Sequence, residues 1–429
     1  MSPGDATVVV EVTDTLGIDF TTGIQRVVRE VVAGLSQEPG IDVVPVVTAA
    51  PGRPMRRLTD EEARRLATHP AGGRAGRRAD DLGPLAPIAR RVGDLPPLVR
   101  ARVALARWRA RRRPARPLHP ELEYRPPPGA VFLDIEGSWY DPTPRSELLP
   151  ELRGRGVHTM AFVHDVMPVV HPEWFTPLHR SVYRDWIEAH LRHTERFLTN
   201  SQHTASELRD VAARSGTTVE PVVVPLGGDL EVRDPRPVPL PDGMERFLLV
   251  VGTLEPRKNQ ELVLDAFERL LPRHPDLGLV LVGKEGWMVD RLVARLRRHP
   301  ERDRRLLWLG GVHDEELEWL YQHAFLCVAP SRYEGLGVPV REALARGRAT
   351  LASTGGAQPE AAGGAAELFD PDDLDGLVRL VARHLEDPEH HAARERAAAA
   401  HRTPTWAETT AVVAEQVREL VTGTRPGDR

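Results

Sequence analysis

Lysine is almost absent from this sequence of 429 residues. Of its 57 lysines and arginines, only Lys258 and Lys284 are lysines. Such a bias is typical of GC-rich coding sequence, so a lysine that is kept marks a position where a compact ammonium group could be needed. The two lysines are therefore the first positions to question.

Cysteine and long apolar runs are also scarce. Cys327 is the single cysteine, which excludes disulfides and cysteine-rich metal sites. Its apolar setting AFLCVAP indicates a buried strand residue. The opening MSPGDATVVVEVTD reaches acidic residues before any long apolar run, and no stretch of 18 apolar residues follows. We therefore expect no signal peptide, no membrane span and a cytoplasmic protein.

The composition is that of a globular protein with one unusual segment. Hydrophobic residues at 41% and charged residues at 28% exclude full-length disorder, and the length predicts two domains. Residues 51–125 carry 19 arginines against 8 acidic residues although the whole chain has a net charge of −5. Within this segment, a basic amphipathic stretch at 96–116 predicts either peripheral contact with an anionic membrane or acceptor, or an exposed surface excursion. Nucleic-acid binding is a third possibility, but the segment has no basic motif interleaved with aromatic residues to support it.

Short apolar runs alternate with amphipathic helical stretches, which predicts parallel sheets covered by helices. The first half has strand-like runs ATVVVEV, IDVVPVV, AVFLDI, HTMAFV and TVEPVVV, with helices predicted over 24–34, 178–193 and 204–213. The second half has FLLVVG, LGLVLVG, RRLLWLG, AFLCVAP and RATLAS, with helices over 259–271, 287–298, 314–323 and 338–346. We predict an α/β fold of two Rossmann-like, doubly wound domains facing each other across a cleft. The first spans 1–235 with an Arg/Pro-rich insertion at 51–128, the second spans 243–402 after a proline-rich linker at 234–242, and a helix at 405–422 crosses back to the first.

The string FLLVVGTLEPRKNQELVLDAFERLL predicts an anion site at the end of a strand. The strand ends at Gly252 and Thr253, and a loop with Arg257 and Lys258 leads into a helix capped near Asn259. Arginine can bridge two phosphate oxygens, whereas lysine brings a point charge to one. Because two cations at a helix start oppose the helix dipole unless an anion is present, we favour a diphosphate clamp over an exposed ion pair.

The string CVAPSRYEGLGVPVREALARGRATLASTGG predicts a second ligand loop. Gly335 and Gly337 allow close backbone approach, and the helix that follows turns its first amides toward the ligand. Glu334 and Glu342 can accept hydrogen bonds from vicinal sugar hydroxyls, although Glu342 could instead cap its own helix.

Together, G-T-x-x-x-R-K-N and S-x-x-E-G-x-G-x-P-x-x-E-A resemble the donor site of retaining group-1 (family 4) glycosyltransferases of the GT-B fold. The resemblance implies that Arg257 and Lys258 hold the donor diphosphate, Glu342 the ribose and Glu334 the transferred sugar. It also implies backbone contacts along the loop and near the base. The implied donor-binding residues are Gly23, Gly252, Thr253, Arg257, Lys258, Val312, Glu334, Gly335, Leu336, Gly337, Val338 and Glu342.

The first half carries a weaker likeness. FTTGIQRVVREVV resembles the family's first glycine loop, with Thr22 and Gly23 where a Gly-Gly pair is common. MAFVHDVMPVVHPEWF resembles the H-D-x-x-P segment of bacterial mannosyltransferase-like members, which implies that His164 lies beside the reacting sugar. The likeness implies His164, Glu334, Arg257 and Lys258 as the catalytic set. A metal site at His164, Asp165 and His171 is the less favoured alternative, because no fourth ligand is evident.

The resemblance implies retaining, metal-independent transfer of a hexose from a nucleotide-diphosphate sugar, GDP- or UDP-linked, to a hydroxyl acceptor. Mannose is the preferred sugar, and the acceptor is a polysaccharide, a lipid-linked glycan or a small molecule. No cofactor is expected besides the donor substrate. A GT-B nucleotide-sugar epimerase and a non-catalytic sugar-nucleotide-binding subunit remain as alternatives.

Overall fold

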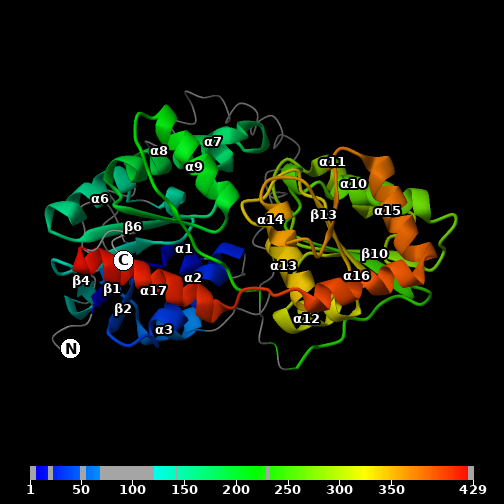
Figure 1. Ribbon diagram of the computed structural model, residues 1–429, viewed down its shortest axis with the longest axis horizontal. Coiled ribbons are helices and arrows are strands. Elements are labelled where there is room, and N and C mark those ends of the chain that lie inside the picture. The colour runs from blue at the N-terminus through cyan, green and yellow to red at the C-terminus, as the bar shows by residue number, and fades with distance from the viewer. Residues whose placement is uncertain are drawn as a thin grey trace. The chain divides into compact units, whose positions relative to one another are not determined.

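The computed structural model describes residues 6–17, 23–48, 55–67, 120–141, 143–228, 232 and 234–423. The chain divides into two compact units (Figure 1). The first contains the described residues up to Leu226 together with those from Trp406 onward, and the second contains Gly227–Thr405.

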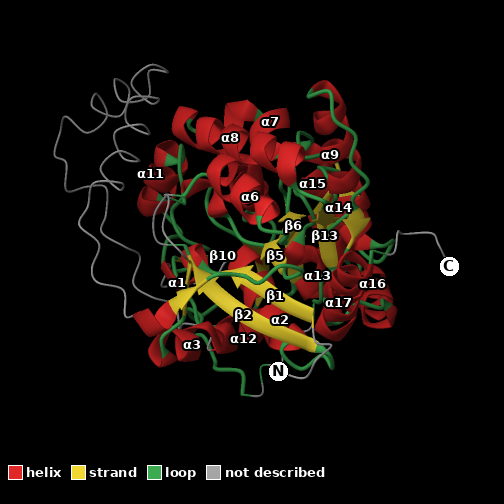
Figure 2. Cartoon of the chain, turned by 90° about the vertical axis from the view of Figure 1, so that its left-hand side faces the viewer, coloured by secondary structure: helices red, strands yellow, loops and turns green. Residues whose placement is uncertain are grey.

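The first unit is built on an eight-stranded sheet of order β4-β3-β2-β1-β5-β6-β7-β8. Its strands are β1 (Ala6–Glu11), β2 (Ile41–Val47), β3 (Met55–Arg57), β4 (Glu123–Tyr124), β5 (Val131–Asp134), β6 (His158–Val163), β7 (Arg196–Thr199) and β8 (Val222–Val223). All pairings are parallel except β2 with β3 and β3 with β4. Figure 2 shows β1 and β2 side by side, and β1 also pairs with β5, so the strand order reverses between β1 and β5.

Helices connect these strands as parallel pairing requires. They are α1 (Thr13–Gly17), α2 (Gly23–Leu35), α3 (Asp60–Ala67), α6 (Arg145–Gly154), α7 (Met167–Val170), α8 (Pro177–His193), α9 (Gln202–Arg214) and α17 (Trp406–Thr422), with 3₁₀ turns η2 (Pro120–Leu122), η3 (Ser138–Tyr140) and η4 (Pro172–Trp174). The last helix, α17, packs against α2, β1 and β5 (Figure 1). Arg196, at the start of β7, pairs with Glu419 of α17 over 2.9 Å.

The second unit holds a six-stranded, fully parallel sheet of order β11-β10-β9-β12-β13-β14. Its strands are β9 (Arg246–Val251), β10 (Leu277–Val282), β11 (Leu306–Leu309), β12 (Leu326–Ala329), β13 (Thr350–Ser353) and β14 (Glu367–Phe369). Its helices are η5 (Pro256–Lys258), α10 (Gln260–Leu270), α11 (Asp290–Arg298), α12 (Asp314–His323), α13 (Val338–Ala345), α14 (Gln358–Ala362), α15 (Leu374–Glu386) and α16 (Pro388–Ala400). The strand order reverses between β9 and β12, as in dinucleotide-binding folds.

Helices bury both faces of this sheet. Alternate strand residues point to opposite faces, so each strand contributes to two cores. In β9, Leu248 and Val250 join a core with α10, α11 and α15, whereas Phe247 and Leu249 join a core with α12 and α13. Cys327 of β12 is buried in the second of these cores, and burial raises the pKa of its thiol to about 12. The prediction of a buried strand cysteine is confirmed.

The predicted elements lie close to the observed ones, with physical reasons where they differ. The run TVEPVVV forms a strand only at Val222–Val223, after Pro221, whose missing N–H cannot join a ladder. Strands β3, β4, β7 and β14 were not predicted, because two to four residues that include a charged side chain form no apolar run.

Two segments were singled out by their composition, the linker at 234–242 and the basic insertion at 51–128. The stretch 234–242, interpreted as a linker, has neither helix nor strand, and Val238 and Leu240 pack against the core of the second unit. The basic segment 96–116 and most of 51–128 lie outside the described residues. Among the residues that the structure describes, no helix is both long and apolar enough to cross a membrane.

Candidate functional site

The predicted donor loops meet where the strand order of the second sheet reverses. Arg257 and Lys258 form the turn η5 after β9, and Glu334 follows β12, the neighbouring strand. In open parallel sheets, ligands bind outside the carboxyl ends of strands at such a reversal. The fold therefore brings the two sequence motifs to one place.

Asn259 joins the two loops, although it does not cap its helix as predicted. It adopts the left-handed conformation with φ 54°, and its side chain makes no cap hydrogen bond to α10. Its amide instead donates to the carbonyl oxygens of Pro330 over 3.2 Å and Pro371 over 2.8 Å. The asparagine therefore ties the loop after β9 to segments that follow β12 and β14.

A single carboxylate organises the site. Oε2 of Glu334 accepts a hydrogen bond from Nη1 of Arg257 over 2.7 Å, and Oε1 accepts from Oγ of Ser331 over 2.6 Å and from Nζ of Lys258. Burial alone would raise the pKa of Glu334, but the charges of Arg257 and Lys258 and these hydrogen bonds lower it to about 2. Glu334 is thus an anion bound where the sequence places a donor phosphate.

Two further charged groups surround this ion cluster. Glu255 is 3% exposed and pairs with Nη2 of Arg257 over 2.7 Å, and burial raises the pKa of its carboxyl group. Burial lowers the pKa of Lys284 to about 8, against the opposing charge of Glu255. Glu255, which precedes Pro256 in the same motif, was not predicted as a site residue.

The glycine loop after Glu334 has little spare room. Gly356 has φ 61°, and a Cβ there would lie 2.4 Å from the carbonyl oxygen of Glu334, so only glycine fits. Gly337 has φ 95° and is the residue before α13, which begins at Val338. Gly335 and Leu336 therefore lead directly from the carboxylate cluster to a helix start.

Glu342 lies inside α13 and does not cap it. Its side chain is 4% exposed, and Oε2 accepts a hydrogen bond from the hydroxyl group of Tyr321 in α12 over 2.8 Å. Tyr321 is thus a positioning residue that sequence reasoning missed. Val312 is partly buried against the same core, and Gly252 and Thr253 follow β9.

In the first unit, His164 follows β6 and is held in one orientation. Its Nε2 lies 2.8 Å from the carbonyl oxygen of Ile135, and its ring stacks on Phe162 at 4.7 Å. Burial lowers the pKa of His164 to about 4, so the ring is neutral at pH 7, with its proton on Nε2. Nδ1 is then an acceptor for a hydroxyl group. Gly23 is the exposed first residue of α2, and residues 18–22 before it lie outside the described residues.

His164, Asp165 and His171, the less favoured metal site, are not among the described side chains whose ligand atoms converge. Asp165 accepts from the backbone N–H of Met167 over 3.0 Å, and His171 lies 3.1 Å from Glu173 and stacks on Trp174. Each side chain faces a different partner.

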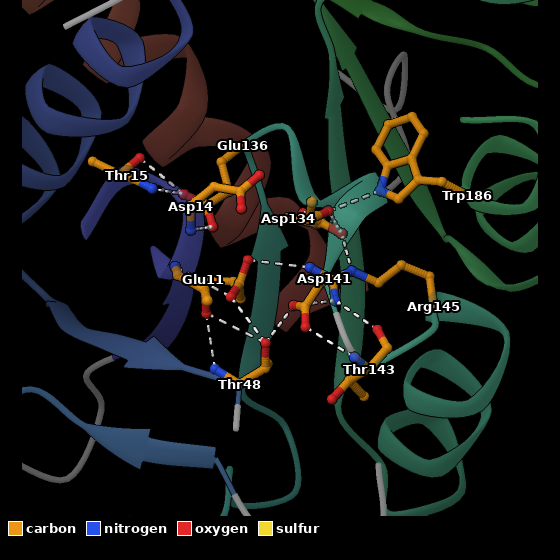
Figure 3. Close-up of polar contacts among 12 residues, drawn as sticks. Glu11, Asp14, Thr15, Thr48, Asp134, Glu136, Asp141, Thr143, Arg145 and Trp186 are labelled. Carbon is orange, nitrogen blue, oxygen red and sulfur yellow. Dashed lines mark hydrogen bonds and ion pairs between the residues drawn. The ribbon is translucent and has the colours of Figure 1, made fainter. Parts of the chain in front are cut away.

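A buried ion network that the sequence did not predict lies at the reversal between β1 and β5 (Figure 3). Arg145 of α6 binds three carboxylates: Asp134 through Nε over 2.5 Å, Asp141 through Nη1 over 3.1 Å and Glu11 through Nη2 over 3.1 Å. The side chains of Glu11, Asp134 and Asp141 are all within 1% of full burial. His190 adds a contact of 3.0 Å to Asp134.

A fourth carboxyl group in this network, that of Glu136, fixes α1. Glu136 accepts hydrogen bonds from the backbone N–H groups of Asp14 over 2.7 Å and Thr15 over 2.9 Å (Figure 3). Burial and the neighbouring charge of Glu11 raise the pKa of Glu136 well above its usual range, and burial raises the pKa of Glu11 as well. Burial and the charge of Glu11 also raise the pKa of Asp14 to about 7.

Known proteins are similar to this chain in sequence, and solved structures are similar to it in fold. Residues 233–401 match the family model described as glycosyl transferases group 1. The serotype-specific mannosyltransferase WbdA of Escherichia coli is 32% identical over 220 residues, which are 46% of this chain and 27% of that protein. The MMP alpha-(1->4)-mannosyltransferase of Mycolicibacterium hassiacum is 31% identical over 224 residues, 50% of this chain and 52% of that protein. These matches span about a quarter to a half of the length of the curated relatives.

Solved structures extend the fold likeness to the whole chain. Sucrose-phosphate synthase from Thermosynechococcus elongatus superposes with a TM-score of 0.64 at 18% identity, covering 97% of this chain and all of that one. Anabaena Alr3699/HepE in complex with UDP gives 0.59 at 15% identity, covering 96% and 100%. The fold is therefore GT-B, as predicted. The likeness to group-1 glycosyltransferases lies in the second unit, where the family model matches.

Arg145→Met should destabilise the first unit by about 3–5 kcal/mol, because three buried carboxylates would lose their cation. Arg155→Met, beside the same helix, should cost at most about 1 kcal/mol, because its pair with Glu151 at 3.8 Å is exposed. Urea unfolding followed by circular dichroism measures both. Equal losses for the two variants would contradict the network's role.

Asp14→Asn should remove a pH dependence of stability. The pKa of Asp14 is raised in the folded protein to about 7 from 3.8, so the folded state binds the proton more tightly than the unfolded state. Wild type should therefore lose stability relative to the variant as pH rises from about 4 to about 7, and stay level above that. We expect a change of about 2 kcal/mol, because Asp14 is only partly buried. Thermal melts at pH 4.5, 5.5, 6.5 and 8 measure this. Melting temperatures that change in parallel with pH in the two proteins would contradict the prediction.

Proposed function

We propose that the protein is a retaining hexosyltransferase that moves a sugar from a nucleotide-diphosphate sugar to a hydroxyl acceptor. The observation that carries this proposal is the binding of Glu334 by Arg257 and Lys258 at the strand-order reversal. An anion already lies between the two cations that the motif assigns to phosphate. The mannosyltransferase names of the relatives favour mannose, carried by GDP or UDP.

The donor diphosphate would replace Glu334 as the partner of Arg257 and Lys258. Both cations would then face the negative charge that grows on the leaving group as the anomeric C–O bond breaks. Glu334, released from the ion pairs, would accept hydrogen bonds from hydroxyl groups of the sugar. No cofactor or metal is needed in this scheme, since the cations supply the charge.

The acceptor oxygen would form its bond to the anomeric carbon on the face that the diphosphate leaves. Its proton would pass to an oxygen of the departing phosphate, so the chain need supply no general base. His164 is neutral and fixed through Nε2. Its Nδ1 would accept a hydrogen bond from a hydroxyl group of the sugar and so orient the sugar. Glu342, held by Tyr321, would accept hydrogen bonds from the ribose.

The acceptor would be a glycan, a lipid-linked glycan or a small molecule. The curated relatives include an O-antigen chain mannosyltransferase of Escherichia coli, which favours a growing polysaccharide. Peripheral membrane contact through 96–116 would suit a lipid-linked acceptor.

Glu334→Gln should separate nucleotide binding from transfer. The variant lacks the charge that competes for Arg257 and Lys258, so GDP or UDP should bind as tightly as to wild type or up to about tenfold more tightly. Transfer should fall at least a hundredfold, because the hydroxyl contacts of the sugar lose a charged acceptor. Thermal shift with each nucleotide and a product assay measure the two effects.

The controls of this experiment address the alternatives. If neither nucleotide raises the melting temperature of wild type, the assignment of the donor site is wrong. Conversion of the donor sugar without any acceptor would instead identify an epimerase, and binding without single-turnover transfer would identify a non-catalytic subunit.

Lys258→Arg should lose most of the transfer activity while the fold survives. Nζ of Lys258 shares one oxygen of Glu334 with Ser331, and a planar guanidinium is too broad for that shared position. Lys284→Arg is the matched control and should be milder, because Lys284 lies at a different strand end. Near-wild-type rates for both variants would mean that codon bias alone explains which lysines remain.

A further inference from the structure

Three metal-ligand side chains meet at the opposite end of the second sheet from Glu334. Glu367 is the first residue of β14, His384 lies near the end of α15, and His390 lies in the first turn of α16. Because β14 runs parallel to β13, its first residue lies at the amino end of the sheet, whereas Glu334 follows the carboxyl end of β12. The cluster is therefore separate from the donor site.

The ligand atoms of this cluster already converge. Oε2 of Glu367 is 2.9 Å from Nε2 of His384 and 3.0 Å from Nε2 of His390. The three atoms lie within 4.8 Å of one another. Ligands of a tetrahedral zinc ion with bonds of about 2.0–2.1 Å stand roughly 3.3 Å apart, so small side-chain adjustments would suffice.

The orientation of His384 is set by a neighbour on its other nitrogen. Nδ1 of His384 lies 3.0 Å from Nδ1 of His391, whose ring stacks on Phe325 at 4.2 Å. A proton on Nδ1 of His384 would be accepted by His391, which leaves the lone pair of Nε2 for a cation. Metal-bound histidines are held in this way by a hydrogen bond on the second ring nitrogen.

We propose that Glu367, His384 and His390 bind one divalent transition-metal ion, with Zn²⁺ the best fit. Two imidazoles and one carboxylate favour Zn²⁺, Co²⁺ or Ni²⁺ over Mg²⁺ or Ca²⁺, and three protein ligands leave the fourth position to water. Arg394 lies 3.7 Å from Oε2 of Glu367, and its positive charge opposes the metal ion. We therefore expect micromolar rather than nanomolar affinity.

The role of this ion is structural. It would tie β14 to α15 and α16, which are separated only by Asp387. The helix α16 packs against α13, the helix that carries Glu342. Metal binding would therefore stabilise the second unit without taking part in the transfer reaction.

The test uses the full chain without a histidine tag, stripped with a chelator and desalted. ZnCl₂ is titrated by calorimetry and CoCl₂ by visible absorption, which reports the coordination of the ion. We expect one site per chain, a higher melting temperature with Zn²⁺, and affinity at least tenfold weaker in His390→Gln and in Glu367→Gln. His323→Gln, an exposed histidine on α12 of the same unit, should bind as wild type does.

Two outcomes would overturn the proposal: no stoichiometric binding by wild type, or equal binding by His390→Gln and His323→Gln. Both test variants change partly buried rather than fully buried side chains, and circular dichroism establishes that they fold. GDP and UDP affinities are measured with and without the chelator. Their independence of metal would separate this site from the donor site, so that either proposal can fail alone.

Discussion

The parallel sheet is the constraint on which the chemistry of this protein depends. A sheet covered by helices on both faces has no room for charged side chains along its strands, so they gather at strand ends. Where the strand order reverses, the connections from two adjacent strands leave in opposite directions and open a space for a ligand. The β9/β12 reversal holds Glu334 with its cations, and the β1/β5 reversal holds Arg145 with its carboxylates.

The two ion clusters are built for different tasks. Arg145 is 1% exposed at its side chain, and its three partners use all the nitrogens of its guanidinium, so this cluster is closed and fixes the loops around it. Around Glu334, two cations meet on one carboxylate that a diphosphate could replace oxygen for oxygen. Such an arrangement keeps the cations oriented before the donor binds, which lowers the reorganisation that binding requires.

The sequence predicted that Arg257, Lys258 and Glu334 face one ligand, but it predicted neither their ion pairs nor the Arg145 network, and the reason is physical. Arg257, Lys258 and Glu334 lie in loops marked by glycine and proline, whose backbone requirements are visible in the sequence. Glu11 and Asp134 are single acids at the ends of apolar runs, and Arg145 is one arginine among many. Only the pairing of β1 with β5 brings the two acids together. The strings EVTD and LDIEG, which place acids directly after apolar strands, were the available signal.

The geometry also gives a reason for one of the two lysines. Arg257 contacts Oε2 of Glu334 and Glu255, so its fork already spans two carboxylates. Lys258 approaches Oε1, where the hydroxyl group of Ser331 is also bound, and a point charge on a flexible stem can share that oxygen. If phosphate replaces the carboxylate, the same division applies: arginine spans two oxygens, and lysine follows the one that carries the growing charge. A protein that has replaced nearly every lysine by arginine would keep lysine at such a place.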